Sequence, residues 1–274
     1  SYFVPANAGI FACDAITSKD KKLTVLSRDL FSFAEFHRVM LSETAQPSRA
    51  SQLIQVAKLL VAVLFVKVLL AIVYEYRWYF PANFDATFLL GRESSFTGLY
   101  ATAFYTHIIS GPLTVLLGTF LMWSGARMRF PLLHRWAGRL QVLLIFIALV
   151  PSGLMMARQT LAGPIAGYGF TALALATAFS ASAMLYYAVT KRFALHQQWA
   201  SRCYVLLLSP LLLRISGGGF VVLQWESAWT YRLNAWCSWL LPLVMLEIYR
   251  CYLQRGEPAV PRRTRLLFRK ESLS

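Results

Sequence analysis

Apolar and polar positions in this chain are arranged in long blocks, and six apolar runs dominate its length. They cover residues 53–74, 98–123, 140–157, 163–189, 203–225 and 233–253. A helix needs about 20 residues to cross the ~30 Å hydrocarbon core of a bilayer. It also satisfies its own backbone hydrogen bonds there. The pattern predicts an all-α, polytopic membrane helix bundle of about six transmembrane helices.

The segments outside this bundle are polar. Residues 1–50 form a mixed N-terminal tail, and residues 254–274 form a basic C-terminal tail. Between them, residues 51–253 make up the membrane domain. Within the N-terminal tail, residues 30–37 are aromatic enough to form a short interfacial helix, with a loosely ordered tail as the alternative.

The composition is that of a membrane protein, and it bears on which partner the net positive charge indicates. Hydrophobic residues make up 57% of the 274 positions and charged residues 14%, against about 25% in soluble domains. The mean hydropathy is +0.51. A net charge of +15 would suggest nucleic acid in a soluble protein. Because the basic residues here lie between apolar runs, we expect contact with the lipid bilayer surface and no nucleic acid.

The distribution of Lys and Arg predicts the orientation of the spans. With six spans, 20 of these residues fall on the side of the two termini and four on the opposite side. Positively charged loops favour the cytoplasm. We therefore predict a bacterial inner-membrane protein with both termini cytoplasmic.

A short internal repeat links the third and fifth runs. Residues 134–144 read HRWAGRLQVLL, and residues 196–207 read HQQWASRCYVLL. From the tryptophan onward, the matching positions are offset by 63. Both copies begin at the predicted inner side, so spans 2–3 and 4–5 would be parallel repeats. Such a repeat would place His134 and His196 at the same depth.

Two histidines at one depth suggest a haem site. A b-type haem can take one imidazole from each of two helices as axial ligands, with basic groups for its propionates. His134 and His196 are the candidate ligands, and Arg139 and Arg202, together with Arg135, are the candidate partners of the propionates. The plainer interpretation is that these residues are interfacial anchors beside Trp136 and Trp199.

A second candidate site lies nearer the predicted outer side. His107 lies within span 2 and Arg214 within span 5, at similar depths. Ionisable residues in spans often mark functional sites. Pro112 is expected to open the helix beside His107. Arg214, for which we expect no acidic partner at its depth, would use carbonyls, hydroxyls such as that of Ser110, or an anionic ligand. The pair predicts a pocket for a lipid or a small anion.

Other features suggest structural roles. Glu247 matches Lys58 in depth, which predicts an ion pair if spans 1 and 6 touch. Gly163 and Gly167 form a G-x-x-x-G motif that is typical of close helix packing. The first outer loop is rich in aromatic rings and suggests an interfacial belt or, more specifically, an entrance for lipid or quinone. The four cysteines lack C-x-x-C spacing and are expected to be small apolar residues.

No common catalytic motif is present. The sequence lacks H-E-x-x-H, G-x-S-x-G, G-x-x-x-x-G-K-[ST] and G-x-G-x-x-G, and no span carries paired carboxylates. These patterns therefore predict no particular reaction, and whether the chain is an enzyme stays open.

The motifs nevertheless resemble a known family. His107-x-x-x-Gly111, Arg127-x-Arg129 and the residues from His134 to Arg139 are similar to a bacterial family of predicted membrane proteins, domain of unknown function 2306. His196-x-x-Trp199 and Arg214 fit its second half, except that Ala200 stands where Met is usual. The resemblance covers about residues 75–250. The resemblance implies a multi-span membrane architecture and supports the choice of these residues as candidates. It implies no particular activity.

Three hypotheses follow from the sequence. The first is a redox protein that binds b-type haem through His134 and His196 and exchanges electrons with a partner or a quinone. The second is a non-redox binding or transport-like protein with a pocket at His107 and Arg214. The third is a structural accessory subunit.

Overall fold

The computed structural model describes residues 49–256, except positions 87 and 161. In this part of the chain every regular element is helical. The longer helices are α2 (Arg49–Glu75), α3 (Gly98–Met122), α5 (Pro131–Leu144), α6 (Val150–Arg158), α7 (Pro164–Val189), α8 (Phe193–Leu207), α9 (Ser209–Val222) and α10 (Ala228–Gly256). The expected interfacial helix at 30–37 lies outside the described residues, as do most of both tails.

The chain divides into two compact units, residues 1–63 and 64–274. Of the first unit, the described part is the beginning of α2, an apolar helical segment whose large side chains are exposed, such as Leu53 at 70% and Val61 at 68%. A helix that exposes so many apolar side chains is suited to lipid rather than to water. All contacts described below lie within the second unit.

Among the described residues, five helical segments are long and apolar enough to cross a membrane. They are Arg49–Trp78, Gly98–Met122, Pro131–Arg158, Pro164–Val189 and Phe193–Val222. These segments correspond to the first five apolar runs of the sequence. The sixth run lies in α10, which has 29 residues and is long enough to span but carries more polar and charged side chains. The prediction of a multi-span helical bundle is therefore confirmed.

The helix α10 docks on α9 partly through polar groups. Asn234 Nδ2 donates to the Leu213 carbonyl at 3.0 Å, and the hydroxyls of Ser209 and Ser238 lie 3.2 Å apart. Both serines and Asn234 are buried. Hydrogen bonds of this kind hold membrane helices together where the apolar driving force is weak.

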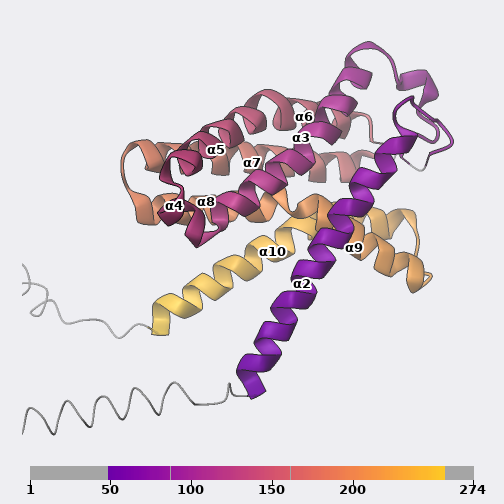
Figure 1. Ribbon diagram of the computed structural model, residues 1–274. Helices are drawn as coiled ribbons and strands as arrows, with labels where there is room; N and C mark the ends of the chain where they lie inside the picture. The colour runs from indigo at the N-terminus through magenta and orange to yellow at the C-terminus, as the bar shows by residue number, and fades with distance from the viewer. Residues whose placement is uncertain (1–48, 87, 161, 257–274) are drawn as a thin grey trace, which may run out of the picture. The chain divides into compact units, whose positions relative to one another are not determined.

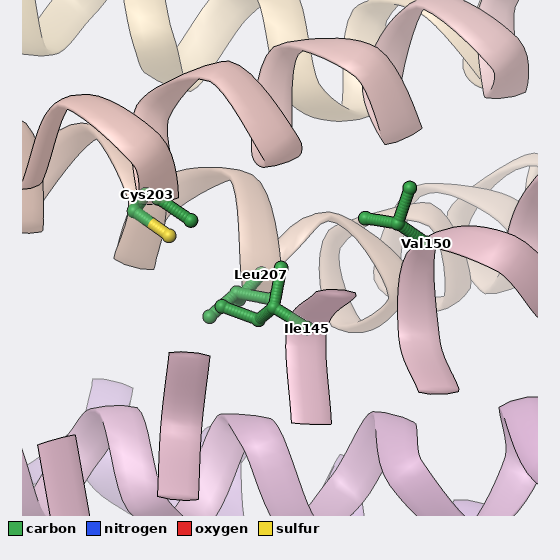
Figure 2. Close-up of a cluster of buried hydrophobic side chains, with 5 residues drawn as sticks. Ile145, Val150, Cys203 and Leu207 are labelled. Carbon is green, nitrogen blue, oxygen red and sulfur yellow. The ribbon is translucent and has the colours of Figure 1, made fainter. Parts of the chain in front are cut away.

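Helices α3, α6, α7 and α8 lie side by side in the second unit, with α10 against α7, α8 and α9 (Figure 1). A cluster of buried apolar side chains packs between these helices. Ile145, Val150, Cys203 and Leu207 contribute to it, and Figure 2 shows that they come from two different spans. The core is thin because most large apolar side chains face outward, as expected for a bundle in lipid.

Two of the spans are interrupted near their middle. Between α5 and α6 the backbone forms a π-helical turn, Ile145–Leu149, and α6 then carries Pro151 in its first turn. Between α8 and α9 the helix is broken at Leu208, and Pro210 follows. Proline removes a backbone donor and cannot continue a regular α-helix without adjustment. Each interruption thus places a proline at the start of the second half of its span.

The internal repeat is visible in local geometry. The Arg139 guanidinium lies 4.9 Å from the centre of the Trp136 ring, and that of Arg202 lies 4.6 Å from the Trp199 ring. In each copy the peptide N–H of the histidine donates to a carbonyl four residues earlier at 2.9 Å. The two copies thus begin in the same way, although His134 precedes its tryptophan by two residues and His196 by three.

The loop before α3 folds into an aromatic cluster rather than a row of isolated rings. Tyr79, Leu89 and Phe104 are at most 4% exposed and form its centre. Phe96 meets the Phe104 ring edge-on at a centroid distance of 5.3 Å. The belt inferred from the sequence is therefore in part a small packed core at the start of α3.

Candidate functional site

His134 lies on α5 and His196 on α8. Each lies in the first turn of its helix, and each is half-buried. The two imidazoles are near enough to interact electrostatically, and Arg127 acts on His134 in the same way. They do not occupy equivalent positions in the repeat, because the one-residue difference before the tryptophan rotates a side chain by about 100° around a helix.

The two imidazoles differ in their hydrogen bonding. His196 Nδ1 lies 2.9 Å from the Met184 carbonyl oxygen. A carbonyl only accepts, so Nδ1 carries the proton and Nε2 of the neutral ring keeps its lone pair. The Nδ1 atom of His134 is buried and has no hydrogen-bond partner among the described residues. The pair therefore combines one oriented ring with one whose buried nitrogen is unsatisfied.

Arg202 is held by a carboxylate. Its Nε and Nη2 donate to the two oxygens of Glu247 at 2.6 and 2.9 Å. Arg202 on α8 is thus the partner described for Glu247 on α10, and the predicted pair with Lys58 stays a prediction. This bidentate bond also directs Arg202 away from the role expected for it beside a haem propionate, whereas the contact given for Arg139 in the described part of the chain is with the Trp136 ring.

We expect Glu247→Gln to loosen the contact between α8 and α10. A half-exposed ion pair contributes little, on the order of 1 kcal/mol or less. The melting temperature should therefore fall by a few degrees, measured by circular dichroism in detergent. In the double variant with Arg202→Gln, the melting temperature should fall by less than the sum of the decreases in the two single variants. Strict additivity would show that the two side chains do not interact.

Arg214 also has an acidic partner. Its Nη1 lies 2.9 Å from Glu75 Oε2, near the end of α2. The expectation that no acidic residue is available is wrong, because the helix continues far enough to place Glu75 beside α9. Burial raises the pKa of the Tyr79 phenol next to this pair; the Glu75 carboxylate adds to the rise and Arg214 opposes it.

His107 faces α6. Its Nδ1 lies 3.1 Å from Ser152 Oγ, and the Ser152 hydroxyl donates to the Ala148 carbonyl at 2.6 Å. Ser152 Oγ therefore accepts from the imidazole, and neutral His107 carries its proton on Nδ1. A Cβ added at Gly153 would lie 3.3 Å from the His107 ring. His107 and Arg214 thus have separate partners, and no hydrogen bond or ion pair described for them joins the two.

Pro112 does not break α3. The proline lacks an N–H, so the Ile108 carbonyl has no helical donor. The Tyr76 hydroxyl donates to this carbonyl instead. The expected opening beside His107 is therefore closed by a side chain from the end of α2.

A group of polar residues on α3, α5 and α8 was not identified from the sequence. Gln141 is 2% exposed, and its Nε2 donates to the Thr114 carbonyl at 3.0 Å. The Tyr204 hydroxyl lies 2.9 Å from Thr119 Oγ1. A Cβ added at Gly118 would lie 2.9 Å from the Tyr204 ring. Gln141 and Tyr204 are 63 residues apart, so the repeat offset was the signal that could have paired them.

The loop before α3 is fixed by a buried arginine. Arg92 is 7% exposed. It donates to the Gln159 carbonyl at 2.8 Å, to the Tyr100 hydroxyl at 2.7 Å and to the Phe88 carbonyl at 3.0 Å. One guanidinium therefore joins the loop, α3 and the end of α6.

The described residues contain no cluster of three or more His, Cys, Asp and Glu side chains suited to a metal ion. A haem with two axial imidazoles does not require such a cluster. The geometry of the pair is thus the relevant observation for His134 and His196.

Fold and side-chain placement together define a multi-pass helical membrane protein with polar contacts between its spans. A family model described as "Predicted membrane protein (DUF2306)" matches residues 104–250. The chain belongs to this family, and the matched region contains His107, His134, His196 and Arg214. No curated protein and no solved structure matches the chain.

Proposed function

We propose that the chain binds a b-type haem between α5 and α8, with His134 and His196 as axial ligands. The observation that supports this proposal is that His134 on α5 and His196 on α8, two separate spans, are near enough for their charges to interact. A b-type haem between them would take both imidazoles as axial ligands.

Hydrogen bonding around the pair supports the same assignment. Histidine ligands commonly donate their second ring N–H to a carbonyl or carboxylate, which fixes the ring and makes the other nitrogen more basic. His196 has such a bond to the Met184 carbonyl. The buried Nδ1 of His134 has no hydrogen-bond partner among the described residues, so no hydrogen bond at this atom fixes the tautomer of the ring.

Basic groups near α5 suit the propionates. Arg139 and Arg135 follow His134 closely on α5, while Arg202 is committed to Glu247. A bound haem would supply one-electron chemistry, and these side chains would hold and orient it. The redox role then requires an electron-transfer partner, of which a membrane quinone is one class.

The test is ligand replacement. His134→Ala and His196→Ala should each abolish stoichiometric haem, quantified as pyridine haemochrome in detergent-purified protein. His107→Ala is the matched control, because it removes an intramembrane histidine outside the pair and should keep the pigment. Equal haem content in all three variants and the wild type would overturn the proposal.

We also place the protein in the bacterial inner membrane with both termini in the cytoplasm. The distribution of Lys and Arg supports this orientation. Terminal fusions to a reporter that is active only in the cytoplasm would be active at both ends. Activity at one end alone would contradict an even number of spans.

The lipid or small-anion pocket at His107 and Arg214 is the weaker proposal. Arg214 is already neutralised by Glu75 at 2.9 Å, and His107 is engaged with Ser152. An anion would have to displace the Glu75 carboxylate, which reduces the electrostatic gain of binding.

A further inference from the structure

The middle of the chain is basic and contains no acidic residue. Residues 94–225 include nine Lys and Arg and no Asp or Glu. Two of the nine are paired with carboxylates from outside this stretch. Six others are exposed and lie near the beginnings of α5 and α8: Arg127, Arg129, Arg135, Arg139, Lys191 and Arg192. Among the described residues no carboxylate is within ion-pair distance of these six, so this surface is open to an anionic partner.

Part of this surface is an ordered elbow between α3 and α5, residues 123–136, which we call the basic elbow (Figure 1). It consists of the end of α3, the short helix α4 (Ser124–Arg129) and the beginning of α5. The Ala126 N–H donates to the Trp123 carbonyl at 3.0 Å, and the Phe130 N–H donates to the Ala126 carbonyl at 2.9 Å. Ala126 is completely buried. The basic elbow is therefore held against the bundle, and its arginines project from a fixed backbone.

The basic elbow also exposes large apolar side chains between its arginines. Those that are at least 50% exposed are Trp123, Met128, Phe130, Leu132, Leu133 and Trp136. An apolar surface of this kind marks a contact with a membrane or a partner. At the edge of a bilayer, apolar side chains enter the acyl region, and arginine extends its guanidinium to the headgroups. Tryptophan is enriched at the same level.

The combination of the two features favours one class of ligand. Guanidinium groups bind phosphate oxygens through paired N–H donors. A free phosphate ion would use the arginines alone and leave Met128 and Leu132 uncovered. An anionic phospholipid would use both features, because its headgroup meets the arginines while its acyl chains cover the apolar side chains.

We propose that the basic elbow is a binding site for anionic phospholipid, and that it retains such lipids in preference to zwitterionic ones. Arg127 and Arg129 bind the headgroup, and Met128, Phe130 and Leu132 contact the acyl chains. The selectivity arises from net charge, because a zwitterionic headgroup carries a cation that the arginines repel. This proposal does not rest on haem binding, and its test leaves Arg135, a candidate partner of a haem propionate, unchanged.

The test measures lipid occupancy of the full chain by native mass spectrometry in detergent, titrated with phosphatidylglycerol or phosphatidylcholine of the same acyl chains. A basic side chain near an anionic surface contributes about fivefold in affinity. We therefore expect half-occupancy at a phosphatidylglycerol concentration at least about tenfold below that of phosphatidylcholine. The double variant Arg127→Gln with Arg129→Gln should lose most of this preference. Met128→Ser with Leu132→Ser should weaken the binding of both lipids and keep their ratio.

A control of equal charge separates the elbow from net charge alone. The double variant Arg77→Gln with Arg158→Gln removes two exposed arginines from the opposite end of the bundle, where α3 begins and α6 ends. It should keep the preference of the wild type. A third titration adds inorganic phosphate at the lipid concentration, and it should displace no phosphatidylglycerol.

Three results would overturn the proposal. The first is equal half-occupancy by the two lipids in the wild type. The second is an equal loss of preference in the Arg127/Arg129 variant and in the Arg77/Arg158 control. The third is displacement of the lipid by inorganic phosphate, which would show that the arginines bind the phosphate group alone. None of these results depends on haem content, so the two proposals fail separately.

Discussion

Replacing Gly167 by Ala is expected to lower the stability of the protein, because the added methyl group would press on the backbone of a neighbouring helix. A Cβ at this position would lie 2.8 Å from the Ala157 carbonyl oxygen and 3.2 Å from Thr160 Cγ2. The first contact is with backbone of α6, which cannot rotate away as a side chain can. Overpacking of this kind costs about 1–3 kcal/mol. Thermal unfolding in detergent, followed by circular dichroism, measures the loss.

Gly218→Ala is the control for this change. It adds the same methyl group to a helical glycine where nothing lies within 4 Å. Its melting temperature should equal or slightly exceed that of the wild type, because alanine favours the helix. If Gly167→Ala melted at the same temperature as Gly218→Ala, the close approach of α6 and α7 would be contradicted.

Replacing Arg92 by Met is expected to release the loop before α3 from the bundle. Methionine fills similar volume but removes the donors to the Gln159 carbonyl and the Tyr100 hydroxyl. Each buried group left unsatisfied costs about 1–3 kcal/mol. Limited proteolysis should cut the segment between residues 79 and 97 faster in the variant, and the melting temperature should fall.

Arg92→Lys should restore little, because a single ammonium cannot reproduce the planar fork of donors. Arg77→Met serves as the control, since Arg77 is exposed and stacks on Tyr74 and Trp78 without joining the loop to α6. Proteolysis of Arg92→Met at the rate of Arg77→Met would show that Arg92 does not anchor the loop.

The spans could be predicted because apolar length alone determines them. The runs at 98–123 and 163–189 differ from helices α3 and α7 by one residue at one or both ends. Only one of the two glycines in the G-x-x-x-G motif packs closely against a neighbouring helix. Gly167 packs closely against α6, whereas Gly163 has a φ of 88° and begins α7. The motif letters could not distinguish these two roles.

Partners of buried charges were harder to predict, because they depend on helix rotation and on where a helix ends. Glu75 follows directly after the apolar run 53–74, so the pattern of apolar runs does not show that it lies beside Arg214. Glu247 was matched by depth to Lys58, whereas the structure pairs it with Arg202 on α8. Gln141 lies within the internal repeat, but its burial and its bond to the Thr114 carbonyl depend on the side of α5 on which it lies.

The proposed haem site is tested most directly by the absorption spectrum of the detergent-purified chain, produced with haem available and recorded before and after reduction with dithionite. The account predicts a Soret band that shifts and sharpens on reduction, together with a reduced α-band typical of two axial imidazoles. A folded protein without pigment would contradict it, and His134 and His196 would then be anchors at the membrane surface beside Trp136 and Trp199.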